Sequence, residues 1–313
     1  MLGFGGIAHA RSKAKRALER QLSPGLVKQV ARRPELLDLT ATTRLMSFLD
    51  CRIRGFAALT EALARDPISI SRLSRRTLTP LTQAVLERKG VIDRMRPDGF
   101  TAFFNAPLDD PAHAVHACEC ALSMMQALEK VNQTLEHGLS ADGIALGPVG
   151  IGIGVNTGLA VVGDFGTDTV PNYCVAGRTA ELAGEIQQLS ANYGAAILVG
   201  EATRAMAESK FAFLEVDIVG SKSEERTPLF ALLGTPVSRA NPKFLALKES
   251  HERAVEAYRA KEWEKARALI AQCRTLSGAN SMLYELYLER IDHLASHPPD
   301  RDWNGVFNTP IVR

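Results

Sequence analysis

The sequence predicts an α+β fold, in which helices pack on a mixed or antiparallel sheet. Segments with the alternation of strands and segments with the period of helices follow each other in an order that is not a simple βαβα alternation. The run Arg96-Pro97-Asp98-Gly99 separates two short apolar segments, a pattern typical of a hairpin turn between antiparallel strands. Hydrophobic residues make up 46% of the 313 residues and charged residues 23%, which excludes a disordered or low-complexity chain.

The first half of the chain predicts helices around three short strands. Residues 10–34 have the period of a helix that is broken near Pro24. The next elements are a buried strand over 44–51, a helix over 55–88 interrupted around Pro67 and Pro80, and strands over 91–95 and 100–105. Apolar residues then recur at steps of three and four, which predicts a long helix to about Glu136 with Asp110 as its N-cap.

The stretch between residues 149 and 233 is richer in strands. We expect strands over 149–156, 159–163, 195–199, 211–219 and 228–233, and helices over 179–191 and 201–209. The glycines of VGIGIGVN (149–156) alternate with Val and Ile, so this segment favours a strand over a phosphate-binding loop.

The composition changes at about residues 235–243, and the chain beyond is helical and aromatic. The spacing of Ala254, Tyr258, Trp263 and Ala266 is typical of a helical hairpin of tetratricopeptide type. A single unit of this type does not make a solenoid, so we expect the hairpin to dock on the main domain. The Pro-rich end, residues 298–313, is expected to be irregular.

The net charge and the cysteines argue against several classes of protein, among them nucleic-acid-binding and disulfide-rich proteins. The net charge of +2 gives no general attraction to nucleic acid. The five scattered cysteines show neither a disulfide framework nor metal-ligand spacing, which predicts a reducing, cytoplasmic compartment. No run approaches 18 apolar residues, so no spanning helix is expected. Up to position 34 there are eight basic residues and one acid, Glu19, which predicts either peripheral contact with the inner face of a membrane or a solvated helix face.

Four segments in this order carry a resemblance. They are IRGF (53–56), DGFTAFFNAPLDDPAHA (98–114), GIGIGVNTGLAVVGDFG (150–166) and AAILVGEAT (195–203). Together they resemble the catalytic domain of class III adenylate/guanylate cyclases of the bacterial sensor type. The resemblance covers about residues 40–235 and continues into 15–37 and 302–307. It implies a ferredoxin-like cyclase domain over 41–235, preceded by a basic helical linker (1–40) and followed by a helical hairpin and tail (236–313).

The resemblance also implies a chemistry. Such cyclases join the 3′-hydroxyl of a nucleoside triphosphate to its own α-phosphate and release pyrophosphate. Two Asp residues hold two metal ions, Mg²⁺ or Mn²⁺, and a Lys with an Asp or Thr reads the purine. An Asn and an Arg from the partner subunit orient the ribose and stabilise the charge on phosphorus. The sites therefore lie at the interface of a dimer.

In this chain most of the corresponding positions are replaced. The first metal Asp falls on Arg52, the purine-reading Lys on Arg94, and the purine-reading Asp or Thr on Cys174. The ribose-orienting Asn falls on Glu181 and the transition-state Arg on Glu185. A further phosphate-binding Lys would lie near Lys222. Of the six principal positions only the second metal Asp, Asp98, is unchanged, so no catalytic residue is assigned.

These replacements oppose the chemistry. A cation at position 52 repels a metal ion, and an anion at position 185 faces a polyanion. Asp50 lies about 6–7 Å along the strand from the usual ligand position, so we do not expect it to substitute. Two explanations remain open. In the first, Arg52 pairs with Asp98 within one subunit, and Arg94, Arg178, Glu181 and Glu185 form further pairs in or across the interface. In the second, the positions drifted after activity was lost, and the exposed charges contribute little.

The sequence therefore predicts a degenerate cyclase that signals by dimerisation or binding and needs no cofactor. One alternative is an active cyclase with an unusual site that uses Mg²⁺ or Mn²⁺. Another is a scaffold that works through its helical tail or basic N-terminal helix. The expected partner is a second copy or another cyclase-type chain, with a purine nucleotide as an open possibility and no nucleic acid.

Overall fold

The computed structural model describes residues 27–28, 32, 39–139, 148–167, 169–170, 172–220, 226–276, 278–300, 303 and 305–306. The chain divides into two compact units, residues 1–187 and 188–313. The helix predicted over 10–34 falls outside the described residues except at Val27, Lys28 and Arg32, which are helical. The domain boundaries predicted near residues 40 and 235 stay predictions.

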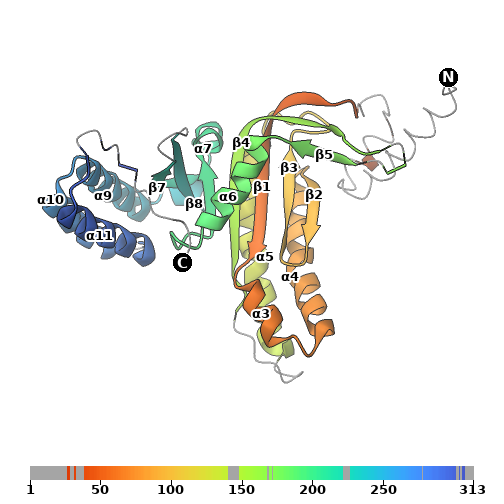
Figure 1. The fold of residues 1–313 in the computed structure, drawn as a ribbon, viewed down its shortest axis with the longest axis horizontal. Helices are drawn as coiled ribbons and strands as arrows, with labels where there is room; N and C mark the ends of the chain where they lie inside the picture. The colour runs from red at the N-terminus through yellow and green to blue at the C-terminus, as the bar shows by residue number, and fades with distance from the viewer. Residues whose placement is uncertain are drawn as a thin grey trace. The chain divides into compact units, whose positions relative to one another are not determined.

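The first unit is built on an antiparallel sheet, as the mixed order of elements predicted. Its strands are β1 (Thr42–Ile53), β2 (Val91–Arg96), β3 (Gly99–Phe104), β4 (Ile151–Asp164) and β5 (Tyr173–Ala176). They follow the order β2-β3-β1-β4, and β5 pairs with the end of β4. β1 is central and pairs with β3 on one side and with β4 on the other. Figure 1 shows these strands in red, yellow and green.

Two strands differ from the expectation. The segments 149–156 and 159–163 form one strand, β4, because Asn156, Thr157 and Gly158 stay extended and pair in register with Phe48, Ser47 and Met46 of β1. The long partner strand thus overrides the local turn tendency of Asn and Gly. The four-residue strand β5 was not predicted.

The helices of the first unit are α3 (Phe56–Ala62), α4 (Pro67–Glu87), α5 (His113–Leu139) and α6 (Arg178–Leu189). The predicted break at Pro67 is present: Pro67 is the first residue of α4, and the side chain of Asp66 caps it by accepting from the N–H of Ser69. The break predicted at Pro80 is wrong, since α4 continues through it. The flanking Leu78 and Leu81 are buried, and this packing holds the helix across the missing hydrogen bond.

Asp110 is not the N-cap of α5, which begins three residues later at His113. Its buried carboxylate instead hydrogen-bonds His116 Nδ1 at 2.6 Å, and its N–H donates to Asn105 Oδ1. The loop before α5 is therefore held by side chains rather than by a cap.

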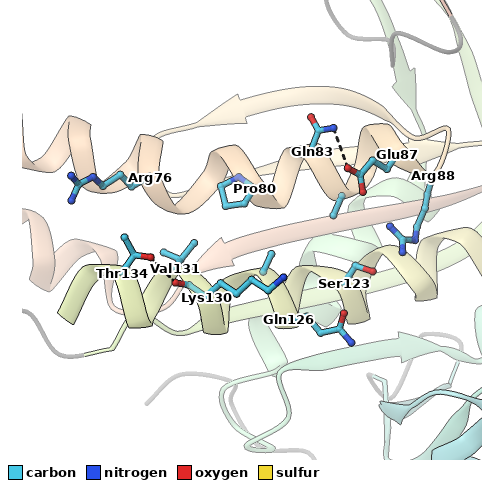
Figure 2. A pocket seen from close by; sticks show the side chains of 12 residues that line it. Arg76, Pro80, Gln83, Glu87, Arg88, Ser123, Gln126, Lys130, Val131 and Thr134 are labelled. Carbon is cyan, nitrogen blue, oxygen red and sulfur yellow. Dashed lines mark hydrogen bonds between the residues drawn. The ribbon is translucent and has the colours of Figure 1, made fainter. Parts of the chain in front are cut away.

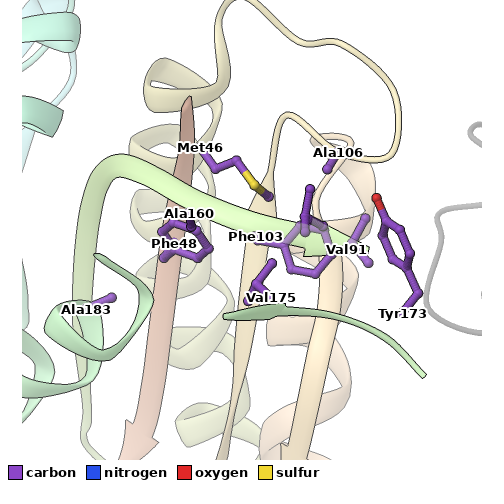
Figure 3. Packing of buried hydrophobic residues seen from close by; sticks show 10 residues of the cluster. Met46, Phe48, Val91, Phe103, Ala106, Ala160, Tyr173, Val175 and Ala183 are labelled. Carbon is purple, nitrogen blue, oxygen red and sulfur yellow. The ribbon is translucent and has the colours of Figure 1, made fainter. Parts of the chain in front are cut away.

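Alternation along β1 divides its residues between the two faces of the sheet. Ser47 faces α5, where its hydroxyl hydrogen-bonds His113 Nδ1 at 2.8 Å. The opposite face carries Met46 and Phe48, followed by Asp50 and Arg52. Figure 3 shows the apolar part of that face, a cluster to which β5 adds Tyr173 and Val175: Met46, Phe48, Val91, Phe103, Ala106, Ala160, Val162, Tyr173, Val175 and Ala183.

The second unit combines a smaller sheet with helices. Its elements are β6 (Ile197–Gly200), α7 (Glu201–Ala207), β7 (Ala212–Val219), β8 (Thr227–Gly234), α8 (Pro236–Arg239), α9 (Pro242–Arg259), α10 (Trp263–Arg274) and α11 (Ser281–Ser296). β8 lies between β6 and β7 and pairs antiparallel with both. The expected helical region is confirmed: α9 and α10 form the hairpin, with the rings of Tyr258 and Trp263 5.9 Å apart, and α11 adds a long helix that was not predicted.

The C-terminal helices dock on β7, the last strand in the order of this sheet. The Tyr287 hydroxyl donates to the carbonyl of Val216 at 3.0 Å, and His251 Nε2 donates to the carbonyl of Glu215 at 2.6 Å. Arg290 and Asp217 form an ion pair at 2.7 Å, and both side chains are almost fully buried. The helices thus cover a strand edge with hydrogen-bond donors.

Candidate functional site

The site predicted from the sequence starts at the end of β1, where Arg52 lies opposite Gly99 of β3. A Cβ atom at Gly99 would lie 2.8 Å from Arg52 Cδ and 1.9 Å from the carbonyl oxygen of Cys51. Glycine therefore leaves the space through which the Arg52 side chain passes. The N–H of Ile53 donates to the carbonyl of Asp98 at 2.7 Å and fixes the β2–β3 turn beside β1.

The guanidinium of Arg52 lies between two carboxylates. Arg52 Nη1 donates to Asp98 Oδ2 at 3.0 Å, and Arg52 Nε donates to Asp50 Oδ1 at 3.1 Å. The second oxygen of Asp50 accepts from Arg96 Nη1 at 3.4 Å. Asp50 is buried, and the side chains of Arg52 and Asp98 are each 29% exposed. The predicted contact of Arg52 with Asp98 is present, within a chain of four alternating charges.

The pKa values in this chain of charges have opposing causes. Burial raises the pKa of Asp50, although Arg52 and Arg96 act to lower it. Burial acts to lower the pKa of Arg52, but Asp50 and Asp98 outweigh it and the pKa is raised. The guanidinium therefore stays charged, and its positive charge is fixed between the carboxylates at neutral pH.

The predicted purine-reading positions lie on β2 and β5. Arg94 is exposed, and its Nε lies 3.5 Å from Asp93 Oδ2. Asp93 also accepts from the hydroxyl of Thr101 at 3.2 Å, and burial raises the pKa of its carboxyl group. Cys174 accepts a hydrogen bond from Asn172 Nδ2 at 3.5 Å, and burial raises the pKa of its thiol, so it stays protonated. Within the chain Arg94 therefore pairs with Asp93, and pairs of Arg94 with Glu181 or Glu185 across a dimer interface stay a prediction.

The two remaining positions lie at the start of α6. Both terminal guanidinium nitrogens of Arg178, Nη1 and Nη2, contact the carboxylate of Glu185, with Nη2 and Oε2 2.8 Å apart. Glu181 Oε2 lies 3.9 Å from Arg178 Nη1. These side chains are at least half exposed, so each acid is paired on the surface of its own helix. Lys222 lies outside the described residues.

The sequence analysis did not predict that Asp50 and Arg96 take part in the chain of charges around Arg52, or that Asp93 pairs with Arg94. Asp50 and Arg52 are two residues apart on one strand, and Arg94 and Arg96 on another, so each pair shares a face. That alternation was the available signal. It required knowledge that β3 lies between the two strands, with Thr101 and Gly99 as the shared neighbours.

The residues do not fit a divalent metal. Metal sites for Mg²⁺ or Mn²⁺ are built from oxygen ligands, and here a guanidinium lies between the two carboxylates that would supply them. Within the described residues, no group of three or more His, Cys, Asp or Glu side chains is placed to hold a metal ion. No step through a metal is therefore derived for this site.

Comparison with known families returns a match over residues 46–234 to the adenylate and guanylate cyclase catalytic domain. This chain belongs to the adenylate and guanylate cyclase family. An adenylate cyclase of Anabaena cylindrica is 32% identical to this cyclase-family chain over 161 residues, which are 51% of this chain and 30% of that protein. Adenylate cyclase 1 of Rhizobium meliloti is 29% identical over 161 residues, 51% of this chain and 23% of that protein. The chain thus spans less than a third of the length of these relatives.

Solved structures agree with the family. The guanylyl cyclase Cya2 has a TM-score of 0.55 and 26% identity, covering 62% of this chain and 94% of that one. The adenylyl cyclase CyaB from P. aeruginosa has a TM-score of 0.55 and 25% identity, covering 62% and 96%. The predicted cyclase-type α+β fold is thereby confirmed. Across the described residues, we find no helix with the length and apolar content that a membrane span requires.

Proposed function

We propose that this member of the cyclase family is catalytically inactive and signals by pairing with a cyclase-type chain. The observation that carries the proposal is the ion pair of Arg52 with Asp98, at the position where the family resemblance implies a metal ligand. A guanidinium held at 3.0–3.1 Å from both nearby carboxylates competes directly with a metal ion for the same oxygens.

The positions on α6 support the same conclusion. Glu181 and Glu185 stand where the resemblance implies a neutral amide and a cation, and both contact Arg178, so neither side chain supplies a positive charge for the phosphates. Loss of one electrostatic contributor to a transition state typically costs about 2.7–4 kcal/mol, a hundred- to a thousandfold in rate. Loss of several contributors that act together leaves little activity.

The proposal that this chain pairs with another cyclase-type chain rests on its family. One solved relative in fold is a guanylyl cyclase domain from Blastocladiella emersonii described as a non-canonical dimer, with a TM-score of 0.50 and 16% identity, so it supports pairing in general and not one arrangement of the dimer. In the arrangement that the resemblance implies, each site takes metal ligands from one subunit and the Asn and Arg from the other. This chain has replacements in both sets, at Arg52 and at Glu181 and Glu185. A heterodimer with an active cyclase-type chain would therefore have no complete site, and this chain would act as an inhibitor.

The first test is an assay of the purified chain with ATP or GTP and with Mg²⁺ or Mn²⁺. We expect no cyclic AMP or cyclic GMP above the blank. Product formation that Asp98→Ala abolishes would overturn the proposal and support an active enzyme with an unusual site. The reverse variant, with Arg52→Asp, Glu181→Asn and Glu185→Arg combined, is expected to bind Mn²⁺ where the parent does not.

The second test concerns pairing. Sedimentation of the chain alone should show a concentration-dependent dimer. Titration of the chain into a catalytic domain from the Anabaena cylindrica relative should lower its cyclase activity if the two form mixed dimers. A chain that stays monomeric at high micromolar concentration, and leaves that activity unchanged, would contradict the pairing proposal.

A further inference from the structure

Two exposed histidines lie one helical turn apart at the end of α11. His293 is in the last turn of the helix, and His297 is its C-cap residue. The centroids of their rings are 4.8 Å apart, and the ring planes differ by 21°. Residues four positions apart are neighbours on a helix surface. Two imidazoles are therefore held together on one solvent-facing side of α11.

The backbone determines which nitrogen of His297 can bind a ligand. His297 Nδ1 lies 3.3 Å from the carbonyl oxygen of His293, and a carbonyl only accepts hydrogen bonds. Nδ1 therefore carries the proton, and in the neutral ring the lone pair is on Nε2. Histidines that ligate metals usually donate the other ring N–H to a carboxylate or a backbone carbonyl, as His297 does here.

The spacing of the pair suits a shared ligand. Two histidines four residues apart on one face of a helix are a known arrangement of zinc ligands. Here the rings stack nearly parallel, so one of them has to turn before both can direct a nitrogen at the same ion. The χ2 angle of histidine is broad, and exposed side chains have room for this rotation.

The surrounding charges favour a cation. Glu289 is exposed and lies one turn before His293 on the same side of the helix. Residues 289–300 contain the acids Glu289, Asp292 and Asp300 against one base, Arg290, which is buried and paired with another acid. The carboxyl end of a helix is also the negative end of its dipole.

Other imidazoles of the described chain are already engaged. Nδ1 of His113 and of His116 hydrogen-bonds a side chain at 2.8 and 2.6 Å, and both nitrogens of the buried His251 are hydrogen-bonded. The groove between α4 and α5, drawn in Figure 2, is lined by neither histidine nor cysteine, and its carboxylate, Glu87, accepts from Gln83. Within the part of the chain that the structure describes, two exposed imidazoles thus meet at the end of α11 alone.

We propose that His293 and His297 bind a divalent transition metal ion of the Zn²⁺ and Cu²⁺ class. Neutral imidazole nitrogens suit these ions, whereas Mg²⁺ and Mn²⁺ prefer oxygen ligands. Two side chains leave further coordination positions, which water fills. The site does not depend on the proposed function, since α11 carries none of the positions that the family resemblance implies.

Bound metal would also stabilise the end of α11. An ion that cross-links two side chains across the last turn binds the folded helix and not the unfolded one, so it opposes fraying there. The same helix carries Tyr287 and Arg290, which contact β7. We therefore expect metal binding to raise the Tm of the protein.

The test is calorimetric titration of the full chain with Zn²⁺, with Mg²⁺ as the comparison. We expect saturable binding of Zn²⁺, none of Mg²⁺, and a rise in Tm with Zn²⁺. His297→Asn should weaken the Zn²⁺ affinity at least about tenfold, since loss of an outer partner of a ligand alone costs about 10- to 100-fold. The rise in Tm should shrink in the same variant.

The matched control is Ala295→His/His297→Asn, which keeps the number of histidines and changes only an exposed alanine besides. Residues two positions apart do not face each other on a helix, so this variant should bind Zn²⁺ as weakly as His297→Asn. Parent-like affinity in either variant would place the metal elsewhere in the chain and overturn the proposal. Absence of saturable Zn²⁺ binding by the parent would overturn it as well.

Discussion

The Arg52 side chain donates from Nη1 to Asp98 Oδ2 across 3.0 Å, from a central strand to the turn between β2 and β3. The contact ties the end of β1 to a hairpin that lies beside it in the sheet. It is partly exposed, and its Asp50 neighbour is buried. The stability of this region therefore depends on keeping a cation at position 52.

Replacing that cation with an acid should destabilise the protein and create a metal site. Arg52→Asp would place a third carboxylate beside Asp50 and Asp98, and we expect a loss of about 2–4 kcal/mol in the free energy of unfolding. Added Mn²⁺ should raise the Tm of this variant, since oxygen ligands would then replace the guanidinium. Thermal melts with and without metal measure both effects.

The control for this experiment is Arg94→Asp, on the neighbouring strand. Arg94 is exposed, but the carboxylate of its partner Asp93 is buried, so this variant should also lose stability; it should differ from Arg52→Asp in that added Mn²⁺ does not raise its Tm. An Arg52→Asp variant as stable as the parent in metal-free buffer would show that position 52 drifted without a structural role.

The close approach at Gly99 gives a steric prediction. Gly99→Ala would place a Cβ atom 1.9 Å from the Cys51 carbonyl oxygen, so β1 and β3 would have to separate. We expect a loss of more than about 2 kcal/mol in urea unfolding. At Gly150 the nearest atom to a new Cβ is Arg54 Cδ at 3.5 Å, so Gly150→Ala should change stability by less than about 1 kcal/mol. Similar losses for the two variants would contradict this reading of Gly99.

Breaking the buried ion pair of the second unit should lower the free energy of unfolding far more than breaking an exposed ion pair. Among the described residues, Arg290→Ala leaves the buried Asp217 with the Tyr193 hydroxyl, 2.6 Å away, and the Ile218 N–H as donors to its side chain, and should cost about 3–5 kcal/mol. Arg267→Ala removes a partner of Asp292 on the surface and should cost less than about 1 kcal/mol. Chemical denaturation of both variants makes the comparison, and equal costs would mean that the buried pair adds nothing beyond its packing.

His251 predicts a dependence of stability on pH. Burial, the largest effect, lowers its pKa, against the opposing influence of Glu215 and Glu252 and with Arg259 acting in the same direction as burial. Its Nε2 donates to the Glu215 carbonyl and its Nδ1 accepts from Tyr284, which suits a neutral ring. A ring with a lowered pKa stabilises the fold above its unfolded pKa of about 6.5, and this contribution is lost as the pH falls through the folded value.

The measurement is the free energy of unfolding between pH 7 and pH 5 for the parent and for His251→Gln. The decrease toward pH 5 should be smaller in the variant. His113, whose pKa burial also lowers, is unchanged in both proteins and so does not affect the difference. A parallel decrease in the two proteins would show that His251 does not titrate with unfolding.

Local patterns were sufficient where neighbours in the sequence are also neighbours in the fold. The Pro97-Asp98-Gly99 turn, the helical period after His113 and the aromatic spacing around Tyr258 and Trp263 all correspond to observed elements. Local patterns failed where pairing with a strand distant in the sequence determines the backbone conformation. Asn156 to Gly158 look like a turn, but β1 holds them extended over a long register.

The candidate site shows the same division. The family resemblance and charge complementarity were sufficient to predict the contact of Arg52 with Asp98. The contact of Arg96 with Asp50 depends on the strand order β2-β3-β1. In this order β3 separates β2 from β1, and the Arg96 side chain reaches Asp50 across it. That order is set by pairing over about fifty residues of sequence, which no short pattern contains.

The donors that Tyr287 and His251 direct at β7 have a consequence for how the second unit unfolds. A chain that ended at residue 235 would leave the carbonyls of Glu215 and Val216 without these donors and the Asp217 carboxylate without its guanidinium. The strand would then resemble an unprotected template for self-association. The helices thus cover this strand edge in the folded protein. If they unfolded before the sheet, the exposed edge would lead to aggregation during unfolding.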